Sequence, residues 1–123
     1  MEITRTRRQG ILQLGLQGRI DFDEAALLER ELSSLIAAGE ERIVLDCRQV
    51  TDVSSHGLRV LMRISKELSQ RQGKLVLHSL SEDVRRSFEA TGFAMILRIS
   101  ETPDEAFAGV GNTGLLPACP IRR

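Results

Sequence analysis

Apolar and polar side chains alternate near the start of the chain. Leu12, Leu14 and Leu16 are separated by polar or small residues, and this period of two is typical of a strand with one buried face. Residues 3–8 are expected to pair with that strand, because the Gln-Gly sequence at 9–10 supplies a turn and glycine readily takes the positive φ that tight hairpins need. The chain is therefore predicted to open with a β-hairpin.

After Gly18 the apolar positions take the spacing of a helix. Asp21 and Glu24 are placed to form a capping box, and Gly39 is placed to end the helix. The segment between them is predicted to be an amphipathic helix that packs on the sheet. Its apolar face consists of Ala25, Leu28, Leu32, Leu35 and Ile36.

Two short, unbroken apolar runs at 43–45 and 75–77 are typical of parallel strands that are covered on both faces. Between them a second helical stripe of apolar residues faces inward, while Arg59, Arg63 and Glu67 face elsewhere. These runs predict a βαβ unit with a right-handed crossover over residues 42–79.

The C-terminal third contains signals for two helices and one strand. Ser81 is placed to cap a helix that stops at Thr91-Gly92, and Thr102 is placed to cap another. Residues 93–99 lie between the two and are predicted to form the last strand.

Together these elements predict one α/β domain over residues 1–110. Its mixed β-sheet is opened by the N-terminal hairpin and packed by about four helices. Residues 111–123 show no periodicity and are predicted to form a flexible tail. A chain of 123 residues can bury one ordinary core, in agreement with a single domain.

Charge and composition narrow the function classes. Basic and acidic side chains are equal in number, 17 of each, and only 3% of residues are aromatic, so nucleic-acid binding is not expected. The sequence shows neither a signal-peptide core nor an apolar segment long enough to span a bilayer. We therefore expect a cytoplasmic protein with no direct membrane insertion.

Metal and cofactor chemistry is not expected either. Cys47 and Cys119 lie far apart, and together with His56 and His78 they do not have the spacing of a zinc site. Glycine-rich nucleotide motifs are absent from the sequence. Cys47 is expected to be a core residue, and His78, at the end of a strand, is expected to lie at the surface without a role.

The stretch 46–58 carries the strongest candidate chemistry. It is expected to run from a buried strand through a loop into the start of a helix, which is where sites gather in open α/β sheets. Ser54 and Ser55 fall at or just before the first helical turn, where unpaired backbone N–H groups and the helix dipole favour a phosphate. The plainer interpretation is that one of these serines is only the N-cap. The two roles are compatible.

Several segments of the chain resemble the STAS domain family. They are G-R-I-D at 18–21, I-V-L-D-C-R-Q-V-T at 43–51, S-S-H-G-L-R-V-L at 54–61 and G-K-L-V-L at 73–77, with E-A-T-G-F at 89–93 and D-E-A-F at 104–107 also matching in order and spacing. The best-known members of this family are bacterial anti-anti-sigma factors, that is, anti-sigma factor antagonists. The resemblance implies a mixed sheet flanked by helices and a protein-binding switch that carries out no chemistry of its own.

The resemblance also implies the partners. In this family the antagonist binds an anti-sigma factor that is a serine protein kinase, the kinase phosphorylates the antagonist, and a PP2C-type phosphatase resets it. Matching the family motif D-S-S-G to S-S-H-G places the phosphoacceptor at Ser55, with Ser54 as the less favoured alternative. Ser54 stands where those members have Asp, His56 replaces the second hydroxyl residue, and Asp52 occupies a position that is usually apolar or aromatic.

The expected partner surface surrounds this serine. Phosphorylation would add about −1.5 to −2 charges, and a penalty of about 2.7 kcal/mol at the interface would weaken binding roughly 100-fold. Arg59 and Arg63 are expected to form an unscreened like-charge pair that a negative partner would relieve, the alternative being a merely solvated helix face. The residues expected to contact the partner are Asp52, Ser54, Ser55, His56, Gly57, Arg59 and Arg63.

Two further functions remain open. A serine at a strand-to-helix turn resembles half of the nucleophile elbow of hydrolases, but Val53 replaces the first glycine. His56 is too close in sequence to serve readily as a base, which leaves His78 as the other candidate. Enzymatic activity is therefore not expected. The stronger alternative is an unphosphorylated STAS scaffold, a subunit of a larger sensor or membrane-transport assembly. A scaffold would bind its partner equally well with Ala or Asp at position 55.

Overall fold

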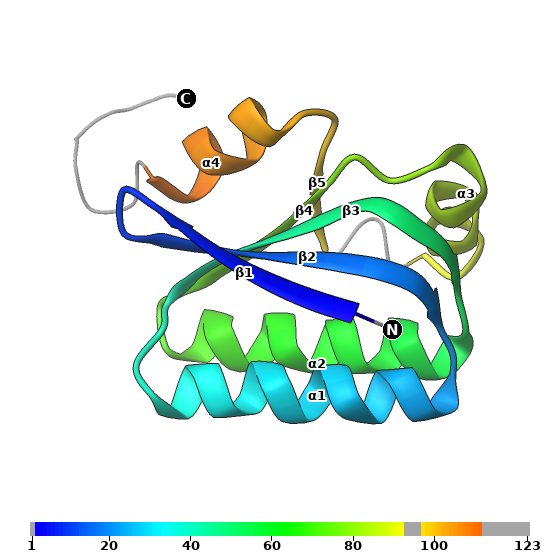
Figure 1. Cartoon of the computed structure of the whole chain (residues 1–123), viewed down its shortest axis with the longest axis horizontal. Coiled ribbons are helices and arrows are strands. Elements are labelled where there is room, and N and C mark those ends of the chain that lie inside the picture. Colours follow the sequence, from blue (N-terminus) through cyan, green and yellow to red (C-terminus); the bar gives the residue numbers. More distant parts are fainter. Residues whose placement is uncertain (1, 93–96, 112–123) are drawn as a thin grey trace.

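A five-stranded β-sheet forms the centre of the structure, with helices on both of its faces (Figure 1). The structure is a computed structural model that describes residues 2–92 and 97–111. In chain order its elements are β1 (Glu2–Arg8), β2 (Ile11–Ile20), α1 (Phe22–Ala37), β3 (Arg42–Val53), α2 (Ser55–Gln70), β4 (Lys74–His78), α3 (Glu82–Ala90), β5 (Arg98–Ser100) and α4 (Pro103–Gly111).

The strands are arranged in the order β1-β2-β3-β4-β5. Strands β1 and β2 are antiparallel, and the remaining neighbours are parallel. The opening hairpin is confirmed, and its turn places both Gln9 (φ 54°) and Gly10 (φ 81°) in the left-handed region, as a tight two-residue turn requires. The mixed sheet and the β3-α2-β4 unit are confirmed as well.

The larger core lies between the sheet and the helix pair α1 and α2, which run side by side beneath one face (Figure 1). Leu12, Leu14 and Leu16 of β2 all point into this core, as their alternation predicts. The predicted stripe of α1 is buried in full. Helix α3 adds Val84 and Phe88 to the same core.

The opposite face of the sheet has a smaller apolar cluster under α4. In this cluster Val44 and Val76, from the centre of the sheet, pack with Ala106 and Phe107 of α4. Strands β3 and β4 are therefore covered on both faces, which explains their unbroken apolar runs. The guanidinium of Arg8 lies 4.6 Å from the centre of the Phe107 ring, a cation–π contact that joins α4 to the hairpin.

Helix starts follow the predicted capping signals. The Glu24 carboxylate accepts a hydrogen bond from the Asp21 N–H at 3.2 Å. Ser81 Oγ accepts from the Val84 N–H at 3.2 Å, and Thr102 Oγ1 accepts from the Glu105 N–H at 3.2 Å. These bonds satisfy N–H groups that lack partners within the helix.

Two predicted boundaries are wrong. The expected loop after Leu45 is a continuation of β3 as far as Val53, because the long strand β2 supplies pairing partners along this length, with two irregularities in register. The last strand was predicted over 93–99, whereas in the described residues Leu97 lies outside the strand and β5 covers Arg98–Ser100. Residues 93–96 lie outside the described residues. The predicted tail beyond Gly111, with Cys119, lies outside them too.

His78 is not a surface residue, because its side chain is fully buried, with 0% of the residue exposed. It sits on the α4 side of the sheet, where its Nε2 is 3.0 Å from Oε1 of Gln13 and its Nδ1 is 2.8 Å from Oγ of Ser79. Burial lowers the pKa of this imidazole below its ordinary value. The ring therefore favours its neutral form in the folded protein.

Cys47 is buried in the larger core, as predicted. Burial raises the pKa of its thiol to about 12. At neutral pH the thiol is protonated, so Cys47 acts as a small apolar side chain.

Stability is expected to fall on mild acidification because of His78. The unfolded chain takes up a proton on this imidazole near the ordinary pKa of 6.5, whereas the folded protein resists it. The free energy of unfolding should therefore decrease as the pH falls through 6.5 and continue to decrease until the lowered pKa of the folded state is passed. Urea denaturation between about pH 7 and pH 5.5, above most carboxylate titration, would measure this slope.

The matched variant is His78→Gln, which keeps a polar group toward Gln13 without a titrating ring. Its slope over the same interval should be smaller than that of the wild type, whatever its absolute stability. Equal slopes in the two proteins would show that His78 does not carry the effect.

Candidate functional site

The predicted site lies where β2 and β3 end and helices α1 and α2 begin. The Ser54 N–H donates to the Ile20 carbonyl at 2.9 Å, which ties the end of β3 to the end of β2. Helix α2 starts at the next residue. The strands thus bring the first turns of two helices to one end of the sheet, as expected for a site in a parallel sheet.

The two serines have different roles. Ser54 is the N-cap of α2, and its Oγ accepts a hydrogen bond from the Gly57 N–H at 3.3 Å. Ser55 is the first residue of the helix and is exposed. One hydroxyl is therefore used by the fold, and the other faces solvent beside the positive end of the helix dipole.

Gly57 explains why α2 sits so close to the sheet. A Cβ at this position would lie 2.8 Å from Ile20 Cγ2, 2.9 Å from Val53 Cγ1 and 3.1 Å from the Ile20 carbonyl oxygen. Only glycine fits without a shift of the helix. Gly57 is buried, so its contribution in this structure is to position Ser55, while its contact with a partner stays a prediction.

Charged side chains surround the serines. Asp52, 56% exposed, lies 3.9 Å from the Arg19 guanidinium, and Arg19 also lies 3.5 Å from Asp21. Pairs this exposed contribute little to stability. They leave a mixed patch of both charges around Ser55, open to a partner.

An aromatic contact missed by the sequence interpretation borders Ser55. The rings of Phe22, at the start of α1, and His56, at the start of α2, meet edge to face with centroids 4.9 Å apart. Phe22 is 64% exposed and Leu27 is 48% exposed, and these are the exposed large hydrophobic residues within 2–92 and 97–109. The signal in the sequence was a phenylalanine directly after a helix cap and outside the apolar stripe.

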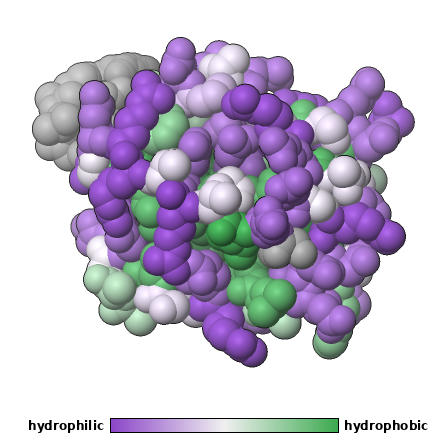
Figure 2. All heavy atoms as spheres, in the orientation of Figure 1, coloured by the Kyte–Doolittle hydropathy of each residue, from purple (hydrophilic) through white to green (hydrophobic). Residues whose placement is uncertain are grey.

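Phe22 and His56 line one end of a groove of about 260 Å³ between α1 and α2. Apolar side chains are visible along the lower part of the molecule, over α1 (Figure 2). The groove is lined by Phe22, Ala25, Ala26, Glu29, His56, Arg59, Val60 and Arg63.

The prediction that Arg59 and Arg63 form an unscreened like-charge pair is wrong. Arg63 forms an ion pair with Glu29 of α1 across the groove, a contact that the local sequence of α2 could not reveal. Arg59 is exposed, and in the part of the chain that the structure describes it is not in an ion pair. Arg59 is therefore a cation beside the groove that is available to a partner.

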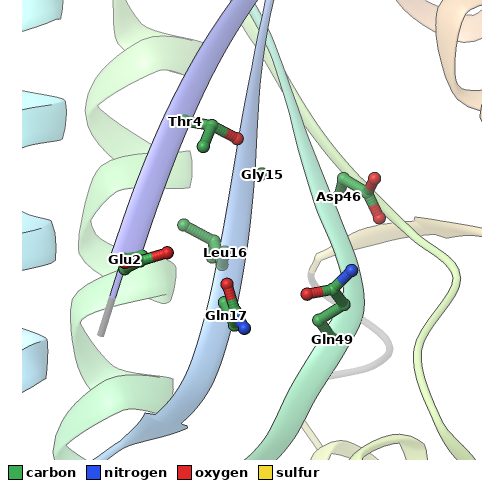
Figure 3. Close-up of a pocket in the computed structure, with 7 residues that line it drawn as sticks. All are labelled: Glu2, Thr4, Gly15, Leu16, Gln17, Asp46 and Gln49. Carbon is green, nitrogen blue, oxygen red and sulfur yellow. The ribbon is translucent and has the colours of Figure 1, made fainter.

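A second hollow, of about 230 Å³, lies over β1, β2 and β3 on the face opposite α1 and α2. Figure 3 shows Gln17 and Gln49 on neighbouring strands at one end, with the Gln49 amide directed toward Gln17, and Gly15 and Thr4 further along the strands. Its lining is polar and shares no residue with the Ser55 region. Within residues 2–92 and 97–111 there is no His, Cys, Asp and Glu cluster suited to a metal ion, and no helix there is long and apolar enough to cross a membrane.

Comparison with known proteins places this fold in a family. The family model described as STAS domain matches residues 2–106. The chain belongs to the STAS domain family. BtrV of Bordetella bronchiseptica, named as an anti-sigma factor antagonist, is 39% identical over 108 residues, which cover 88% of this chain and 93% of BtrV.

Solved STAS structures agree with the fold. An anti-sigma factor antagonist from Thermotoga maritima superposes with a TM-score of 0.84 at 24% identity, covering 89% of this chain and 94% of its own. The anti-sigma factor antagonist SpoIIAA has been solved unphosphorylated, with a TM-score of 0.74 at 19% identity over 88% of this chain and 95% of its own. The structure of phosphorylated SpoIIAA from Bacillus superposes with a TM-score of 0.67 at 18% identity, covering 88% of this chain and 98% of its own. These likenesses confirm the STAS architecture predicted from the sequence.

The division of roles between the serines predicts different costs for their replacement. Ser54→Ala removes the cap of α2 and should lower the free energy of unfolding by about 1 kcal/mol. Ser55→Ala removes an exposed hydroxyl and should change it by less than about 0.5 kcal/mol. Urea denaturation, monitored by circular dichroism, would measure the free energy of unfolding of both variants of this STAS domain. Equal losses, or a larger loss for Ser55→Ala, would contradict the assignment of Ser54 as the cap.

Proposed function

We propose that this protein is an anti-sigma factor antagonist that binds an anti-sigma factor serine kinase and is released when the kinase phosphorylates Ser55. A PP2C-type phosphatase restores the binding form. The protein acts in the cytoplasm as a binding switch and catalyses no reaction itself. The relationship to BtrV supports the general role. The observation that carries the switch is the exposed hydroxyl of Ser55 at the first position of α2.

The fold tolerates a phosphate at this position. The first N–H groups of a helix lack partners within the helix, and the helix dipole favours negative charge at the same end. Ser54 already caps α2, so modification of Ser55 removes no hydrogen bond from the fold. The added charge therefore acts on the partner, which has to bury or repel it.

The partner surface combines a polar and an apolar part. Asp52, Ser55 and His56 form the polar part at the helix start, and Arg59 continues it along α2. Phe22 supplies an exposed aromatic anchor of the kind that often dominates protein interfaces. Because its ring touches His56, an apolar partner residue docked in the groove would lie next to the phosphorylation site.

Phosphorylation and release can be measured together. Mass spectrometry of the protein isolated from its native cells, with phosphatases inhibited, should find phosphate on Ser55 in a fraction that changes with growth or stress. In affinity capture with tagged variants, Ser55→Ala should retain the kinase, and Ser55→Asp should weaken its binding by up to about 100-fold, or about 2.7 kcal/mol. The amount of captured partner is measured by quantitative mass spectrometry.

Ser54→Asp is the matched control for charge, because Asp is itself an effective N-cap. It should affect capture less than Ser55→Asp. A peptide that is unmodified under every condition, together with equal capture by Ser55→Ala and Ser55→Asp, would favour the constitutive scaffold.

The aromatic anchor gives a test that is independent of phosphorylation. Phe22→Ala should weaken capture of the partner by about tenfold or more, as for a central interface aromatic. Leu27→Ala, on the same helix but outside the residues that line the groove, should have a smaller effect. Both residues are exposed and lie outside the buried core, so neither change should unfold the protein. Equal capture by Phe22→Ala and the wild type would exclude the groove from the interface.

A further inference from the structure

A third hollow, of about 200 Å³, lies at the other end of α2 from Ser55. Ser69 lies fourteen positions after Ser55 in the same helix, a rise of about 21 Å at 1.5 Å per residue. The hollow is therefore separate from the proposed switch. It is lined by Ser65, Ser69, Gly73, Lys74, Leu75 and Arg98.

The hollow lies beside the start of β4. In the described residues β5 pairs with β4 only from Val76 onward, where Arg98 lies opposite Val76. Side chains from the end of α2 and from β5 line the hollow together with the first residues of β4.

Two cations converge on this hollow without an acidic partner. Neither Lys74 nor Arg98 is in an ion pair among residues 2–92 and 97–111, and the rest of the chain contains no Asp or Glu. Burial and the nearby charge of Arg98 both lower the pKa of the Lys74 ammonium. The like-charge arrangement expected from sequence for Arg59 and Arg63 is thus found here instead.

Hydrogen-bond donors remain available around the two charges. The Lys74 ammonium has three N–H donors, and one contact is made to the Gly109 carbonyl at 3.5 Å. The Arg98 guanidinium has five N–H donors. Ser65 and Ser69 add hydroxyls that lie one helical turn apart on the same wall. Two positive charges with several donors match a small dianion that has three acceptor oxygens.

We propose that this hollow binds a phosphate group, held by Lys74 and Arg98 and hydrogen-bonded by Ser65 and Ser69. A phosphate monoester fits better than a carboxylate, because it matches both positive charges rather than one. The ligand class is a small phosphorylated molecule or the phosphorylated residue of a peptide, which share this chemistry. The site does not depend on the function proposed for Ser55.

The test is titration of the intact protein with inorganic phosphate, followed by NMR of backbone amides at constant ionic strength. Shift changes should saturate and should be largest at Ser69, Gly73 and Leu75. Acetate and chloride at the same ionic strength should produce smaller changes that do not saturate. Titrations with glycerol 3-phosphate and with a phosphoserine peptide would then distinguish the two sources by their affinity.

Substitutions assign the binding to the two cations. Lys74→Gln and Arg98→Gln should each weaken phosphate binding about tenfold or more, as expected for charge-assisted hydrogen bonds. Arg30→Gln, which removes an exposed cation on α1, should bind as the wild type does. The amide spectrum of each variant verifies its fold.

Two results would overturn the site. The first is a response to phosphate that equals the response to chloride. The second is unchanged phosphate affinity in both Lys74→Gln and Arg98→Gln. The wild-type titration decides the first point even when a variant fails to fold.

Discussion

The close approach of α2 to the ends of β2 and β3 determines the geometry of the Ser55 region. Because Gly57 has no side chain, the first turn of the helix lies directly against Ile20 and Val53. The backbone bond from Ser54 to Ile20 fixes the same junction from the strand side. Packing and hydrogen bonding thus hold the helix start in one place, and Ser55 is carried to the surface by a rigid element. Exposure of this serine is a consequence of the core beneath it.

Charge distribution follows the layers of the fold. On the edge strand, Arg5 forms an ion pair with Glu31 of α1, and Arg7 forms one with Glu40, which follows α1. Arg8 points to the opposite face of the sheet and lies 3.8 Å from Asp104 of α4. The alternation of a strand sends neighbouring arginines to different helices. Charged side chains on an edge strand also oppose the addition of another strand, and here the same arginines attach helices on both faces of the sheet. A chain with zero formal net charge can still leave Arg59 and Lys74 without acidic partners in the described residues.

Local patterns predicted most of the fold, and contacts between distant segments account for what they missed. The capping residues Asp21, Ser81 and Thr102 were identifiable because a cap acts within one helical turn. The full length of β3 was not, since its second half is polar in places and is held by pairing with β2. In the site, Ser54 and Ser55 were found from their position before an apolar stripe. The contact of Phe22 with His56 and the pair of Glu29 with Arg63 were not predictable, because both arise only when α1 and α2 lie side by side.

Positions 54, 55 and 57 have different structural roles, and this difference has an evolutionary consequence. The cap is supplied by Ser54 and the close packing by Gly57, so the fold places almost no demand on the side chain at position 55. Mutations there can alter recognition by another protein without a cost in folding. A lineage of duplicated genes could therefore change partners at this surface while the domain itself is inherited unchanged.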